Sequence, residues 1–433
     1  MIPTIIVAIT SFVAITASIL FFPNVRIKNV RLGTYWMIAL IGAIILIVSG
    51  LAPFGAVLSG VTADGEINPL KILSLFFAMT FMSVVLDEVG FFSYLASKAA
   101  TIAESNQTVL FFSLYALTAV LTVFTSNDVV ILTLTPFIFF FCKRASVSPI
   151  PYLVAEFAAA NTWSMMLVIG NPTNIYLATF AGIGFTDYFK VMALPTLAAG
   201  AVETLVIFLL FRKKLKEPLL KSAEKERIND LPELIVSLAH LAVCLIFLVA
   251  SGYVGIEMWL VSVICAGSLV ISLLIVSLFT RRKSPLLGAV ARLPYELIPF
   301  VLSMFVIIIA LNEQNVTKLI GDLFSGAAPV WVYGGSSFIA CNLINNIPMS
   351  ILFSSLPARL SGTAYYQAIY ATVIGSNVGA FLTPIGALAG IMFTRLTENY
   401  RIDYGFKNFI RFGVVISLPT LAAALGTLSL ILV

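Results

Sequence analysis

Residues 117–137 read LTAVLTVFTSNDVVILTLTPF, with a polar Ser-Asn-Asp tip at 126–128 between two apolar arms. An unpaired polar group is costly in lipid, so polar residues at membrane depth are found where protein or a cavity surrounds them. Residues 338–356, FIACNLINNIPMSILFSSL, repeat this pattern around an Asn-Asn tip at 345–346. Two apolar hairpins with polar tips indicate a substrate path built from two halves.

The composition predicts a polytopic membrane protein. Of 433 residues, 60% are hydrophobic and 10% are charged, whereas ordinary globular chains are about 25% charged. The first apolar run, residues 3–22, has no basic segment before it and is long enough to span, so no cleavable signal peptide is expected. The four cysteines stand singly in apolar runs, so we expect no cofactor and no metal site other than one for Na⁺. The net charge of +5 is attributed to anchoring at the cytoplasmic lipid surface, and no nucleic-acid partner is expected.

Ten apolar runs have the length of about 20 residues that crosses a bilayer. They are residues 3–22, 33–51, 70–99, 152–180, 191–211, 234–254, 258–280, 293–311, 368–396 and 412–433. Most basic residues fall on one side if the two hairpin regions, 108–142 and 329–357, each cross the membrane an even number of times. By the positive-inside rule that side is cytoplasmic, which predicts that both termini are external.

The arms of the second hairpin are too short to cross. Residues 330–341 and 347–356 number 12 and 10, or about 15–18 Å as helix, and a bilayer core is about 30 Å thick. We therefore predict re-entrant hairpins, the first entering from the cytoplasm and the second from outside.

Opposite orientation of the two hairpins is what an inverted repeat produces. In support, LPTLAA at 194–199 recurs at 418–423. We predict an all-α polytopic fold with ten spans and two re-entrant hairpins. The first repeat covers 1–211, a cytoplasmic linker covers 212–232, and the second repeat covers 233–433.

Each hairpin is followed by a span that glycine, proline and asparagine interrupt. The interruptions are GNPTN at 170–174, and GSNVG at 375–379 running on to TPIG at 383–386. Such segments at corresponding positions of two halves mark the binding site of a secondary transporter. The first predicted half-site comprises Ser126, Asn127, Asp128, Gly170, Asn171, Thr173 and Asn174. The second comprises Asn345, Asn346, Ser376, Asn377 and Thr383.

The pattern leaves open whether this site holds an anion or a cation. Helices that begin at the midplane point positive dipole ends at it, while helices that end there present carbonyls that coordinate Na⁺. Asp128 is either a cation ligand or a protonatable coupling residue, and Glu203, deep in a span, is a second coupling candidate. If Na⁺ is the coupling ion, we expect it at Asn127, Asp128 and Asn346.

Other ionisable residues are expected to have structural roles. Asp87 and Glu88 should snorkel or cap a helix, and Glu156 should be solvated near the interface. His240, the only histidine, should be hydrogen-bonded within the structure.

The motifs TLTPF, GNPTN, NNIP and GSNVGAFLTPIGALAG resemble those of the ion transporter superfamily, in its arsenite-exporter and citrate-transporter-like branch. That branch is related to sodium/dicarboxylate symporters and sodium/proton antiporters. The resemblance implies a scaffold domain that holds a homodimer and a transport domain that moves as an elevator. The symporters' Ser-Asn-Thr motifs fall on 126–128 and 345–347, which would hold sodium and a substrate carboxylate.

Two departures bear on the substrate. The arsenite exporters have an acidic residue where Asn377 stands and a lysine near Phe381, and this chain has neither and no thiolate cluster, which disfavours arsenite. No basic residue lies within either interruption, so amides and co-bound cations would have to hold a multiply charged anion.

The function predicted is secondary active transport of a small anion or oxyanion, coupled to Na⁺ or H⁺, in the plasma membrane. Arsenite or antimonite efflux and sodium/proton antiport are the alternatives. An enzyme is not expected, because the one histidine is far in sequence from either interruption and no His/Asp/Glu cluster accompanies it.

Overall fold

The computed structural model describes residues 1–22, 24–27, 30–62, 68–102, 106–218, 228, 230–281, 283–324 and 328–432. Part of the predicted linker, residues 219–227 and 229, lies outside these ranges. In the described residues the chain is helical apart from a short antiparallel hairpin, β1 (Asn24–Ile27) and β2 (Val30–Gly33). The all-α architecture is therefore confirmed.

The helices of the first half are α1 (Ile2–Phe21), α2 (Thr34–Val48), α3 (Phe54–Thr62), α4 (Pro69–Glu88), α5 (Phe91–Ile102), α6 (Gln107–Phe124), α7 (Asn127–Ala145), α8 (Ile150–Trp163), α9 (Pro172–Phe180) and α10 (Phe185–Phe211). Those of the second half are α11 (Leu231–Val254), α12 (Met258–Thr280), α13 (Leu286–Ala291), α14 (Leu297–Glu313), α15 (Val316–Phe324), α16 (Pro329–Ile344), α17 (Asn346–Ser355), α18 (Thr363–Gly379), α19 (Leu388–Asn399) and α20 (Phe406–Ile431). Short 3₁₀ turns are η1 (Ser164–Met166), η2 (Val168–Gly170), η3 (Lys214–Lys216) and η4 (Leu356–Arg359).

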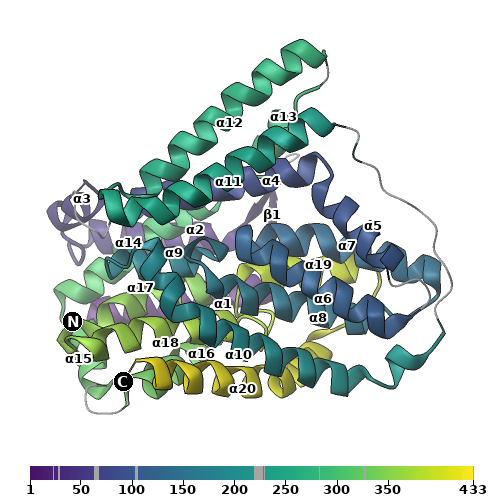
Figure 1. Ribbon diagram of the computed structural model, residues 1–433. Helices are drawn as coiled ribbons and strands as arrows, with labels where there is room; N and C mark the ends of the chain where they lie inside the picture. Colours follow the sequence, from purple (N-terminus) through teal and green to yellow (C-terminus); the bar gives the residue numbers. More distant parts are fainter. Residues whose placement is uncertain are drawn as a thin grey trace.

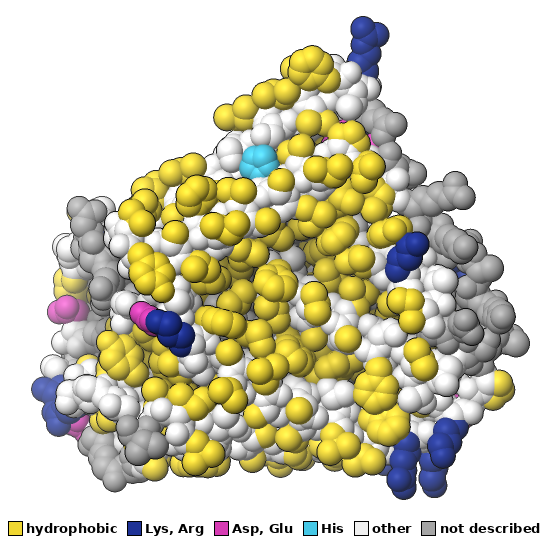
Figure 2. All heavy atoms as spheres, in the orientation of Figure 1, with side chains coloured by type: hydrophobic (Ala, Val, Ile, Leu, Met, Phe, Trp, Pro, Cys, Tyr) yellow, Lys and Arg dark blue, Asp and Glu magenta, His cyan; other side chains and the backbone are white. Residues whose placement is uncertain are grey.

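Seven helices in the described part of the chain are long and apolar enough to cross a membrane: α1, α4, α6, α10, α11, α12 and α20. An eighth span is obtained if α14 and α15, bent by 79° at their junction, count as one. Large hydrophobic side chains cover the face shown in Figure 2, across α11 and α12 and down to α10 and α20. The chain is thus a multi-pass membrane protein, and the count of ten spans stays a prediction.

Two predicted segments have different boundaries in the structure. The run 70–99 divides at Gly90, whose φ of 81° ends α4 and lets α5 start in a new direction. In the second hairpin, α16 has 16 residues, more than the 12 predicted for this arm, while α17 has 10. Because α6, with 18 residues, is long and apolar enough to cross a membrane, the re-entrant nature of the hairpins stays a prediction.

The helices fall into two groups by their contacts. In the first, which we name the frame group, α1 contacts α2, α2 contacts α14, α11 contacts α12 and α12 contacts α4. In the second, the hairpin group, α6 contacts α8, α16 contacts α18, and α10 lies along α20. Exchanging the two halves of the chain converts most of these contacts into one another, as α2 on α14 becomes α12 on α4. Figure 1 shows α11 and α12 along one edge and α10 with α20 along the other, with both termini at the same end.

Glycines allow α16 and α18 to approach closely. A Cβ atom on Gly375 would lie 2.0 Å from Ser337 Oγ and 2.3 Å from the Gly334 carbonyl oxygen. One on Gly379 would lie 2.4 Å from Cys341 Sγ. The prediction that residues 375–379 interrupt a span is therefore wrong: α18 continues to Gly379, and the interruption begins at Ala380. These glycines serve helix contact and do not break the helix.

Candidate functional site

The interruption in the first half spans residues 164–171. After α8 ends at Trp163, η1 and η2 lead to Asn171, whose side chain accepts from the Thr173 amide at 3.1 Å and caps α9. The chain turns so tightly that a Cβ atom on Gly170 would lie 2.2 Å from the Ser164 carbonyl oxygen. This position therefore requires glycine.

Asn377, on α18, lies in the middle of that interruption. Its Nδ2 donates to Asn174 Oδ1 at 2.7 Å, and its Oδ1 accepts from Ser164 Oγ at 2.8 Å and from Asn171 Nδ2 at 3.2 Å. The neighbouring Ser376 Oγ donates to Thr173 Oγ1 at 3.2 Å. All of these side chains are buried. The structure thus brings residues of both predicted half-sites into one hydrogen-bonded set, which we name the Asn377 cluster.

The tip of the first hairpin reaches this cluster through α8. Asn127 Nδ2 donates to Asn161 Oδ1 at 3.4 Å, and the Asn161 carbonyl oxygen, 2.7 Å from Ser164 Oγ, is the alternative acceptor to Asn377 Oδ1 for the single hydroxyl proton of Ser164. Within the described residues, the buried atoms Ser126 Oγ and Asn127 Oδ1 have no hydrogen-bond partner. A buried polar atom without a partner is costly, so both atoms are suited to a bound solute or ion.

Asp128 lies apart from the Asn377 cluster. It lines a cavity of about 540 Å³ together with Arg292, Glu296 and Arg395. A second cavity, of about 610 Å³, is lined by Ser354 of α17 and Glu313 of α14. Each cavity separates the second arm of one hairpin from the frame group.

The second tip is tied to the second interruption, not to the Asn377 cluster. Asn345, with φ 70°, donates through Nδ2 to the Ile385 carbonyl at 2.9 Å, and the Asn346 amide donates to the Gly386 carbonyl at 3.0 Å. Asn342 Oδ1 accepts from the Thr383 hydroxyl at 2.7 Å and from its amide at 3.1 Å. Thr383 therefore holds the loop between α18 and α19 onto α16.

Sequence reasoning missed Asn161, Ser164 and Asn342. A signal was present for Asn161, because it follows three alanines in a mostly apolar span. Asn342 stands only three residues before the predicted tip at Asn345. Ser164 became visible only through its contact with Asn377.

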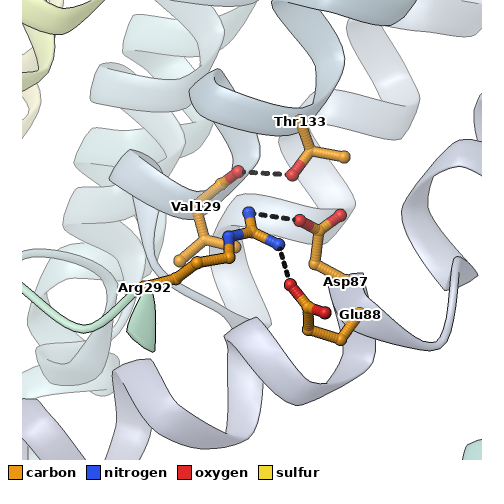
Figure 3. Close-up of polar contacts among 5 residues, drawn as sticks. All are labelled: Asp87, Glu88, Val129, Thr133 and Arg292. Carbon is orange, nitrogen blue, oxygen red and sulfur yellow. Dashed lines mark hydrogen bonds and ion pairs between the residues drawn. The ribbon is translucent and has the colours of Figure 1, made fainter. Parts of the chain in front are cut away.

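Charged groups lie outside the Asn377 cluster. Among the described residues, the hydrogen-bond partners within it are asparagine, serine and threonine side chains and backbone groups. Arg292 instead pairs with Asp87 at 2.6 Å and Glu88 at 2.8 Å. Figure 3 shows these ion pairs beside α7, where Thr133 donates to the Val129 carbonyl at 2.9 Å. Asp87 and Glu88 thus fasten the end of α4 to the segment before α14.

Two carboxyl groups are buried at α8, Glu156 on the helix itself and Glu203 on the neighbouring α10. Glu156, expected to be solvated, is 1% exposed and accepts from Thr135 Oγ1 at 3.0 Å, because α7 covers it. Glu203 is fully buried and accepts from Tyr115 Oη at 2.9 Å and from Thr162 Oγ1. Among the described residues no group of three or more His, Cys, Asp or Glu could hold a metal ion.

Comparisons with known proteins place this architecture. The chain is 29% identical over 407 residues to the arsenical pump membrane protein of Escherichia coli, covering 88% of this chain and 92% of that one. It is 24% identical over 369 residues to the putative arsenical pump membrane protein of Bacillus subtilis, covering 78% and 82%. The crystal structure of the Alcanivorax borkumensis YdaH transporter has the same overall fold, with a TM-score of 0.53 at 14% identity over 99% of this chain and 98% of that one.

The profile of one family settles the membership. The citrate transporter family, CitMHS, matches residues 33–364, a range that includes both hairpins, the first interruption and most of the frame group. Because this range is well over half of the chain, the protein belongs to the CitMHS citrate transporter family.

Proposed function

We propose that this protein is a secondary active transporter in the plasma membrane that exports a small oxyanion or its uncharged oxyacid, with arsenite and antimonite as the favoured substrates. The observation that carries the proposal is the Asn377 cluster, in which neutral amide and hydroxyl groups of both halves meet. Arsenous acid is uncharged at neutral pH and carries three hydroxyl groups. Donors and acceptors of this kind can bind it without thiolates, so the lack of a thiolate cluster does not exclude it. The arsenical pump relatives support the same substrate.

Citrate, which the family description names, is the second candidate. A tricarboxylate placed against the Asn377 cluster would have no cationic side chain among the cluster's described partners to balance its charge. A buried charge without a partner is strongly disfavoured, so citrate would need co-bound cations.

The arrangement of helices suggests how transport proceeds. We infer an inverted repeat, because exchanging the two halves converts most helix contacts into one another. The frame group would act as the scaffold, and the hairpin group would move against it as an elevator in a homodimer. Cavities of about 540 and 610 Å³ between the groups give the moving part room on both sides. Both termini would be external and both hairpins re-entrant.

Coupling would use Na⁺ or H⁺. The unpartnered oxygens of Ser126 and Asn127 favour a cation near the first tip. The sequence expectation for Na⁺ at Asn127, Asp128 and Asn346 stays a proposal. Asp128 and Glu203 are the carboxyl groups that could carry a proton. No catalytic reaction and no cofactor are proposed.

Arsenite exchange in liposomes tests this function. Purified protein is reconstituted, and counterflow of arsenite, antimonite and citrate is measured with and without Na⁺. We expect arsenite to exchange and Asn377→Ala to abolish exchange. Asn408→Ala should retain it, because Asn408 lies near the start of α20 and its amide contacts the Asp403 carbonyl, outside the Asn377 cluster. Exchange of citrate alone would refute the favoured substrate, and full arsenite exchange in Asn377→Ala would refute the site.

A further inference from the structure

The carboxyl group of Glu203 is held by hydroxyl groups from two other helices. Tyr115, on α6, lies 2.9 Å from Glu203 Oε1, and Thr162, at the end of α8, bonds to Oε2. Trp163 Nε1 in turn donates to Tyr115 Oη at 3.0 Å. Both carboxyl oxygens are therefore occupied by hydroxyl groups, in a site that is fully buried.

This arrangement can satisfy either charge state of the carboxyl group. Tyr115 Oη also lies 3.2 Å from the Gly200 carbonyl oxygen, so its proton has two alternative acceptors. With Glu203 ionised, Tyr115 and Thr162 both donate to it. With Glu203 protonated, its O–H donates to Thr162 Oγ1 and the Tyr115 hydroxyl turns to Gly200. The hydroxyl groups paired with the two oxygens can rearrange their protons, so the site accommodates a proton without any further ligand.

Protonation of the Glu203 carboxyl group would affect the substrate site. Thr162 and Trp163 are the last residues of α8, and the next residue, Ser164, bonds to Asn377. The contact with α10 is tight, because a Cβ atom on Gly200 would lie 2.5 Å from the Trp163 ring. A change in the hydrogen bonds of Thr162 is thus two residues away from Ser164, a member of the Asn377 cluster.

The matching position in the second half carries no acid. Thr427 lies as far beyond LPTLAA at 418–423 as Glu203 lies beyond LPTLAA at 194–199, and its hydroxyl donates within its own helix, to the Ala423 carbonyl at 2.8 Å. The contact between α10 and α20 therefore does not require a carboxyl group at this level of the repeat.

Other titratable groups on elements packed against α10 and α6 are engaged elsewhere or lie near helix ends. On α8, Tyr152 donates to Gln107, and Glu156 accepts from Thr135 of α7.

On α11, His240 bonds to Val236 and to Ser272 of α12. Glu233 lies in the first turn of this helix, and Tyr253 is exposed near its last residue. On α20, Lys407 and Arg411 lie in the first turns, beside the C-terminal end of α10, where Phe211 contacts Phe412. Among the described residues, Tyr115 is the titratable side chain hydrogen-bonded to Glu203.

We propose that Glu203 is the proton-binding residue that couples transport to the proton gradient, acting on the substrate site through Thr162 and the end of α8. This inference rests on the proposed function, in which a solute is exchanged at the Asn377 cluster. Glu203 binds one proton on one side of the membrane and releases it on the other as the hairpin group moves.

Separating exchange from gradient-driven transport tests the proposal. In liposomes, Glu203→Gln should retain arsenite exchange but lose accumulation driven by a pH gradient, because glutamine keeps the hydrogen bonds and cannot titrate. Glu203→Asp should recover accumulation with a shifted pH profile. The matched control is Glu156→Gln, which removes a different buried acid, on α8, and should keep both activities.

Infrared spectroscopy supplies a readout that needs no substrate. The wild-type protein should show a protonated-carboxyl band that disappears as pH rises and is missing in Glu203→Gln. If the wild type exchanges no arsenite, the proposed function fails, while this band still decides the role of Glu203. Three results would each overturn the inference. The first is arsenite accumulation driven by a pH gradient in Glu203→Gln, and the second is loss of that accumulation in Asp128→Asn instead. The third is the absence of a carboxyl band that depends on Glu203. If Glu203→Gln does not fold, an unshifted pH profile in Glu203→Asp would do the same.

Discussion

The contact between α16 and α18 depends on Gly375, and replacing this glycine by alanine should separate the two helices. The added Cβ atom would lie 2.3 Å from the Gly334 carbonyl oxygen and 2.9 Å from the Phe338 amide nitrogen. Both are backbone atoms, so rotation of a side chain cannot relieve the overlap. The helices must move apart by about an ångström to restore ordinary contact.

The expected cost can be isolated with a matched variant. Overfilling a tight interior contact costs about 1–3 kcal/mol, and we expect the upper part of this range because the backbone must move. Alanine in place of glycine also favours a helix by about 1 kcal/mol. Gly335, also within a helix of this pair, has open space around its Cβ position. Gly335→Ala gains the helix preference without the overlap, so the difference between the two variants measures the overlap alone.

Thermal unfolding in detergent gives the comparison. Gly375→Ala should unfold at a lower temperature than Gly335→Ala, which should match or exceed the wild type. Because α18 also carries Asn377, Gly375→Ala should slow arsenite exchange as well. Equal unfolding temperatures for the two variants, with full exchange in both, would refute the view that these glycines serve close helix contact.

Three further variants test the first interruption, the loop between α18 and α19, and the ion pairs of Arg292. Gly170→Ala would place a Cβ atom 2.2 Å from the Ser164 carbonyl oxygen, so it should displace Ser164 from Asn377 and abolish exchange, and unchanged exchange would contradict the geometry. Asn342→Leu removes the acceptor for the Thr383 amide and hydroxyl. An unsatisfied donor costs about 1–3 kcal/mol when buried, so Asn342→Leu should unfold at a lower temperature than the wild type. An unchanged unfolding temperature would show that other contacts hold this loop in place. Arg292→Gln leaves the adjacent carboxylates of Asp87 and Glu88 without their cation. The unfolding temperature should therefore fall at low ionic strength and fall less at high salt, where charges are screened. A loss independent of salt would mean that contacts other than charge are affected.

Local patterns in the sequence were sufficient for the membrane class and for the elements that surround the site. Hydrophobic runs identify spans because a segment in lipid must expose apolar side chains. Its backbone groups must also be hydrogen-bonded within the segment, as they are in a helix. A polar tip at 126–128 and glycine and proline at 170–172 mark turns for equally local reasons, and the structure ends helices at both places. Asn171 and Asn174 were recognised on this basis and lie in the Asn377 cluster.

Tertiary structure alone decided which polar residues meet. Ser164 and Asn377 are 213 positions apart and form a hydrogen bond only because two spans from different halves cross there. The role of Gly375 was misread for the same reason: a glycine that breaks a helix and one that admits a neighbouring helix look alike in sequence, and only the position of Gly334 distinguishes them. Glu203 likewise became interpretable once α6 and α8 were seen to bring hydroxyl groups to it. Contacts between distant segments depend on how helices are placed in space, and no local pattern encodes that placement.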